Sequence, residues 1–123
     1  MKEEGSQRKM NDRERNFIDA FESMQLELHQ GNRANGFWDK ERNKGEMIAL
    51  MHSELSEMLE AVRHDNPPSD HIPQFTGAEE ELADLVIRAM DYAEGFQLRL
   101  AAAIVHKVDF NRSRGEMHGG KKF

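Results

Sequence analysis

The feature that most constrains the fold is a regular spacing of apolar residues between positions 44 and 64. Apolar side chains there advance in alternating steps of three and four residues. They are Ile48, Met51, Leu55, Met58 and Val62. This spacing places them on one face of an α-helix, as in the seam of a helical bundle. Helical periodicity recurs over about residues 11–30, 76–95 and 98–114, and no strand-like alternation of useful length appears. The sequence therefore predicts an all-α fold, a bundle of four to five helices.

Turn-forming residues separate these segments. Residues 32–43 form a predicted loop that holds Phe37 and Trp38, and Pro67, Pro68 and Pro73 predict a second loop over residues 65–75. Thr76 and Glu79 have the spacing of a capping box, in which the hydroxyl and the carboxylate bond each other's backbone amides. Gly95 stands where the following helix is expected to stop.

Length and charge limit the classes of protein that fit. The 123 residues suit one helical domain over residues 11–114, with a disordered segment at 1–10 and a Gly- and Lys-rich tail at 115–123. A net charge of −6 argues against binding polymeric nucleic acid, which requires phosphate neutralisation. The chain has no cysteine, and neither a signal peptide nor a membrane span is expected. We expect a cytoplasmic protein.

Two matched pairs of carboxylates carry the chemistry. Glu54-Leu-Ser-Glu57 and Glu81-Leu-Ala-Asp84 each place two acids three residues apart, on one helical face, where like charges repel. Asp91 follows Asp84 by seven residues and shares its face. If the two helices pack antiparallel, the pairs face each other, and a cation offsets the repulsion. Hard oxygen ligands favour Mg²⁺, Mn²⁺ or Ca²⁺.

Two other interpretations of these acids compete. A solvated acidic face explains either pair alone, but two pairs on helices joined by a short loop favour a metal site. Di-iron bundles use Glu-x-x-His on two of their helices. Neither pair here has His at the third position, which makes a redox metal less suitable than Mg²⁺.

The acidic runs resemble a known family. Glu46 to Arg63 reads EMIALMHSELSEMLEAVR and Glu79 to Asp91 reads EEELADLVIRAMD, an ExxE followed after a loop by an ExxD. Together with Lys107 and Asn111 near the end of the last helix, these runs resemble the MazG-like all-α nucleoside triphosphate pyrophosphohydrolases. The resemblance covers roughly residues 35–123, and includes the closing HGGKKF.

The resemblance implies Mg²⁺-dependent hydrolysis, with Mn²⁺ as a possible substitute, of a nucleoside or deoxynucleoside triphosphate to the monophosphate and pyrophosphate. It implies a homodimer or a homotetramer built as a dimer of dimers. Carried over to this chain, it makes four acids the metal ligands. They are Glu54, Glu57, Glu81 and Asp84. Glu57 is our first choice for the carboxylate that positions or deprotonates the attacking water.

Further residues are expected to contact substrate. Lys107, Asn111 and Arg114 form one helical stripe whose cations suit phosphate oxygens, although such a stripe also suits a solvated helix end. Asp91 would complete the site. Trp38 would stack on a nucleobase, or instead plug the helix ends.

Two other functions remain open. One is a non-catalytic helical oligomer that binds a nucleotide or a partner protein and uses metal only for structure. The other is the phosphoribosyl-ATP pyrophosphohydrolase of the same superfamily.

Overall fold

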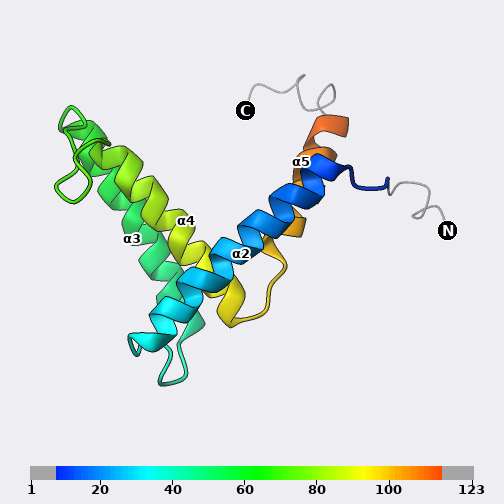
Figure 1. Cartoon of the computed structure of the whole chain (residues 1–123). Helices are drawn as coiled ribbons and strands as arrows, with labels where there is room; N and C mark the ends of the chain where they lie inside the picture. The colour runs from blue at the N-terminus through cyan, green and yellow to red at the C-terminus, as the bar shows by residue number, and fades with distance from the viewer. Residues whose placement is uncertain (1–7, 115–123) are drawn as a thin grey trace. The chain divides into compact units, whose positions relative to one another are not determined.

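A computed structural model of the chain describes residues 8–114, and its regular elements are all helical (Figure 1). The helices are α2 (Asp12–Ala34), α3 (Lys44–Arg63), α4 (Gly77–Gly95) and α5 (Leu100–Ser113). The predicted all-α class is confirmed. None of these helices, within residues 8–114, is long and apolar enough to cross a membrane.

The described chain divides into two compact units. The first comprises residues 8–24 and 99–114, and the second runs from Gln25 to Leu98. The boundary falls inside α2, so that the second half of this helix belongs to the second unit. The predicted acidic pairs both lie in the second unit.

Helices α3 and α4 pack side by side as a hairpin in the second unit (Figure 1). Both begin at a side-chain cap. Asn43 Oδ1 accepts the amide of Glu46 at 2.9 Å. The capping box predicted at Thr76 and Glu79 is present, with both reciprocal bonds formed. These caps satisfy amides that have no partner inside the helix, and they fix where each helix begins.

The proline-rich loop between α3 and α4 is tied to the first turn of α4. Ser69 is buried, and its hydroxyl donates to Glu80 Oε1 at 2.5 Å while accepting the amides of His71 and Ile72. Glu80 Oε2 also accepts from His71 Nδ1 at 2.7 Å. The Ser69 hydroxyl and His71 hold the pKa of Glu80 below its usual value, and Glu80 raises the pKa of His71. The loop is therefore held to the hairpin by polar contacts.

The helix predicted over residues 11–30 continues to Ala34 in the structure. Gly31 does not end it, since a glycine at an exposed helical position costs only about 1 kcal/mol. Contacts made by this part of α2 outweigh that cost: Gln25 donates to Glu94 at 3.0 Å, and His29 bonds Asp91 at 2.7 Å. The predicted loop over residues 32–43 accordingly begins three residues later, after Ala34.

The apolar seam predicted on α3 is only half covered. Met51 and Met58 are half-buried, whereas Ile48, Leu55 and Val62 are exposed. These three residues are seven positions apart and form a single stripe along the helix. The prediction that they face inward is wrong for the single chain, because α4 covers only the neighbouring face of α3. On α4, Leu82 is likewise exposed, while Met90 and Ala93 are buried.

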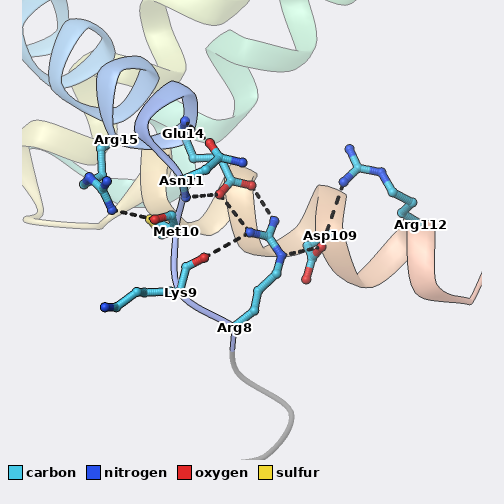
Figure 2. A network of polar contacts seen from close by, with 8 residues as sticks. All are labelled: Arg8, Lys9, Met10, Asn11, Glu14, Arg15, Asp109 and Arg112. Carbon is cyan, nitrogen blue, oxygen red and sulfur yellow. Dashed lines mark hydrogen bonds and ion pairs between the residues drawn. The ribbon is translucent and has the colours of Figure 1, made fainter.

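In the first unit, a polar network joins the segment before α2 to α5 (Figure 2). The Arg8 guanidinium pairs with Glu14 and donates to Asp109 at 3.1 Å. Glu14 also accepts the Asn11 amide at 3.0 Å, while Asn11 Oδ1 accepts the Glu14 amide at 2.8 Å. The hydrogen bond from Arg8 makes the largest contribution, followed by that from the Asn11 amide, and together they lower the pKa of Glu14 to about 2. The start of α2 is thus capped and charge-paired in one cluster.

Candidate metal centre

Three of the four predicted metal ligands converge between α3 and α4. Glu54 and Glu57 lie one turn apart on α3, and Glu81 lies on α4. One carboxylate oxygen from each lies within 4.8 Å of the others. The i, i+3 spacing brings the first two together, and the packing of the hairpin supplies the third. Asp84 is not in this group, although it lines the adjoining cavity with Glu54.

Burial sets this cluster apart from a solvated acidic face. Glu54 is only 6% exposed, and Glu81 Oε1 is buried with no hydrogen-bond partner among the described residues. Burial, followed by the nearby Glu54 and Glu57 carboxylates, raises the pKa of Glu81 to about 7. Burial and the charge of Glu54 also raise the pKa of Asp84. The site therefore disfavours its own negative charges until a cation offsets them.

The donor set fits a hard divalent cation. Three carboxylates supply only oxygen atoms, which are the ligands that Mg²⁺ and Mn²⁺ prefer. The buried Glu81 oxygen without a partner is an atom that a metal ion would satisfy. Neither sulfur nor histidine belongs to the cluster in the described chain. The residues present thus fit the cation that the sequence analysis expected.

A cavity of about 460 Å³ opens beside the acids. Its volume lies within the range of small-molecule sites. Glu54, Asp84 and Asp91 contribute negative charge to its lining. The remaining lining residues come from α2, the following loop, α3 and α4. They are Asn32, Phe37, Arg42, Met47, Leu50, Ile87 and Arg88. Cationic, aromatic and carboxylate groups therefore share one space next to the candidate metal centre.

Asp91 is engaged in a buried polar cluster at one side of this cavity. Its carboxylate accepts from His29 Nδ1 at 2.7 Å and from Trp38 Nε1 at 3.1 Å. The indole ring of Trp38 also packs edge-on against His29 and Phe96. Trp38 is half-buried and does not line the cavity, whereas Phe37 is exposed and does. Contact of Trp38 and Asp91 with substrate stays a prediction.

The remaining predicted substrate residues lie on or just after α5, in the first unit. Lys107 Nζ lies 4.8 Å from the ring centre of Phe110, and the Arg114 guanidinium lies 5.4 Å from it. Asn111 is exposed. Their role in binding substrate stays a prediction. The predicted tail at 115–123, with its HGGKKF sequence, lies outside the described residues, as does most of the predicted disordered segment, residues 1–7.

Sequence reasoning missed Arg88. Its Nε donates to Glu54 Oε2 at 2.6 Å, which makes it the counter-charge of the most buried acid in the cluster. Arg88 follows Asp84 by four residues and Glu81 by seven, and therefore lies on the acidic face of α4. That spacing was visible, but it suggests a pair with Asp84 on the same helix rather than with Glu54 on α3.

No protein-family model, curated protein or solved structure matches this chain. The resemblance to the MazG-like family accordingly stays a hypothesis that rests on the acidic motifs.

Proposed function

We propose that this protein hydrolyses a nucleoside or deoxynucleoside triphosphate to the monophosphate and pyrophosphate, with Mg²⁺ as the metal and Mn²⁺ as a substitute. The observation that carries the proposal is the convergence of the Glu54, Glu57 and Glu81 oxygens within 4.8 Å, beside a cavity of about 460 Å³. A phosphate-bearing ligand would share that cation with the acids.

The acids would have different roles, according to their surroundings. Glu54, Glu57 and Glu81 would hold the cation, with Asp84 beside them at the cavity wall. The bound ion supplies neutralisation of phosphate charge and lowers the pKa of bound water. Glu57 is the most exposed acid of the cluster. It is therefore the best placed to orient a water molecule and accept its proton as water adds across the bond between the α- and β-phosphates.

The cavity offers groups for the rest of such a substrate. The guanidinium groups of Arg42 and Arg88 line it and suit phosphate oxygens. Phe37 presents an exposed aromatic ring at the same cavity, and a ring of this kind can stack on a nucleobase. A mixed charged and aromatic lining favours a nucleotide over a purely apolar ligand.

A homodimer or homotetramer is part of the proposal. The stripe formed by Ile48, Leu55 and Val62 is exposed in the single chain, and Leu82 and Val86 on α4 are exposed as well. Apolar side chains gathered on a packed helical hairpin are typical of an interface between subunits. Sedimentation equilibrium would measure the assembly. A monomer at micromolar concentration would contradict this part of the proposal.

The decisive experiment is turnover. The purified chain with Mg²⁺ and a panel of nucleoside triphosphates should release pyrophosphate, detected by phosphorus NMR. Glu57→Gln and Glu81→Gln should each lower the rate by about 100-fold or more, because the cluster loses a ligand or a base. Glu60→Gln is the matched control, since this exposed acid on α3 lies outside the cluster and pairs with His64. Full activity in both cluster variants would refute the proposal, and nucleotide binding without product would favour the non-catalytic alternative.

A further inference from the structure

Arg88 and a metal ion at the candidate metal centre would compete for the charge of Glu54. Glu54 is 6% exposed, and a carboxylate so buried is costly unless a cation pairs with it. Arg88 provides that cation within the described chain, through the 2.6 Å bond from its Nε to Glu54 Oε2. Yet Glu54 also contributes an oxygen to the cluster with Glu57 and Glu81. A metal ion and the Arg88 guanidinium therefore draw on the same negative charge.

The side chain of Arg88 has room to move. It is 41% exposed, in contrast to 8% for the side chain of Glu54. Arg88 also lines the cavity of about 460 Å³ that adjoins the acids. Its guanidinium can accordingly leave Glu54 and still remain within the cavity. A planar guanidinium with several N–H donors matches the oxygens of a phosphate group.

We propose that Arg88 is a phosphate-binding residue whose guanidinium pairs with Glu54 until a divalent cation takes up the charge of that carboxylate. When Glu54 shares its charge with a divalent cation, Arg88 loses its partner and turns its guanidinium to the phosphate oxygens of the nucleotide. Metal binding and phosphate binding are thereby coupled through one side chain. The phosphate half of this inference rests on the proposed function, while the competition between Arg88 and a metal ion does not.

Two binding measurements with opposite expected signs test the inference. The first is calorimetric titration of Mn²⁺ alone into wild type and Arg88→Gln. The variant should bind Mn²⁺ about five- to tenfold more tightly, because the ion no longer displaces a partly exposed ion pair. The second titrates a non-hydrolysable α,β-imido nucleoside triphosphate into the Mn²⁺-loaded proteins. There the variant should bind about tenfold or more weakly. If Arg88 only maintained the fold, its substitution would weaken the binding of both Mn²⁺ and the analogue.

Arg42→Gln is the matched control for the Mn²⁺ titration alone. Arg42 lines the same cavity, but its guanidinium donates to the backbone carbonyl of Phe37 at 3.1 Å. Its substitution should leave Mn²⁺ affinity within twofold of wild type. Arg88→Lys keeps the charge, so it should bind Mn²⁺ like wild type and still bind the analogue less tightly, for want of the planar guanidinium. The helical signal in circular dichroism checks that each variant is folded. If Arg88→Gln does not fold, the titration of the nucleotide analogue into Arg88→Lys tests the phosphate-binding role.

Unchanged or weaker Mn²⁺ binding by folded Arg88→Gln would overturn the competition. Equal affinity of wild type, Arg88→Gln and Arg88→Lys for the analogue would overturn the phosphate-binding role. Wild-type protein that binds Mn²⁺ but not the analogue would overturn the proposed function and the phosphate half together. The Mn²⁺ titration would still decide whether Arg88 and the metal compete, so the two failures are distinguishable.

Discussion

Gly95 is expected to be irreplaceable because Trp38 lies directly against its backbone. A Cβ atom built on Gly95 would lie 2.2 Å from Cη2 and 2.6 Å from Cζ2 of the indole ring. Carbon atoms in contact prefer a separation of about 3.5–4.0 Å. In a Gly95→Ala variant the ring must therefore move by more than about 1 Å, and this movement carries Trp38 Nε1 away from the carboxylate of Asp91 that it bonds at 3.1 Å.

The magnitude follows from three contributions. Loss of a hydrogen bond to a charged group costs about 1.5–3 kcal/mol, and overpacking costs about 1–3 kcal/mol. Alanine regains at most about 1 kcal/mol of helix propensity at this terminal position. The free energy of unfolding should fall by about 1.5–6 kcal/mol. With a urea m value of about 2 kcal/mol/M, this corresponds to a midpoint lower by about 1–3 M.

Urea denaturation followed by circular dichroism measures the loss, and Trp38, the single tryptophan, reports its own surroundings by fluorescence. Gly31→Ala is the matched control, since nothing lies within 4 Å of the added Cβ on α2. It should stabilise the protein by up to about 1 kcal/mol. In a Trp38→Leu background the cost of Gly95→Ala should shrink below about 1 kcal/mol. Equal stability of the two alanine variants, with unchanged Trp38 emission, would refute the reasoning.

Three other substitutions test the acids and the loop beside them. In EDTA, Glu81→Gln should be more stable than wild type above pH 7 and equal to it below pH 4.5. The reason is that wild type loses stability as pH rises from the unfolded pKa of 4.5 through the folded pKa of about 7. Thermal melts at pH 4 and pH 8 measure the difference in stability between Glu81→Gln and wild type. An equal difference at the two pH values would contradict the prediction. Ser69→Ala should lower the free energy of unfolding in urea by about 1–3 kcal/mol, because the buried hydroxyl joins Glu80 to two loop amides. Its control is Ser113→Ala, which removes an exposed hydrogen bond within α5 and should lower that free energy by less than about 0.5 kcal/mol. Thr76→Ala should cost about 1 kcal/mol and speed hydrogen exchange in the first turn of α4, and protected amides there would contradict the capping role.

The helices were predictable because each carries a local signal. The periodicity of α3, the capping box at Thr76 and the prolines of the following loop are all set by neighbours in sequence. The same is true of the Glu54 and Glu57 pair, whose spacing alone places both acids on one face. Its approach to Glu81 was expected if the two helices packed antiparallel, and α3 and α4 do pack as a hairpin.

Contacts made at long range were not predictable. α4 ends at Gly95, as predicted, but the positive φ that follows it belongs to Gln97, and the space that Gly95 leaves for Trp38 was not foreseen. Nothing local relates residues 38 and 95. The exposed stripe of Ile48, Leu55 and Val62 was missed for a similar reason: periodicity shows that a face is apolar but does not show what covers it.

Burial is what distinguishes the cluster from a merely acidic surface. Repelling carboxylates at the end of exposed side chains would turn apart into water at little cost. Glu54 cannot do so, because it is buried, and Glu81 keeps one oxygen buried without a partner in the described part of the chain. The hairpin packing thus holds these groups together against their repulsion, and Arg88 relieves only one of them. A divalent cation would relieve all three at once, and this relief is the physical reason for proposing a metal-dependent function.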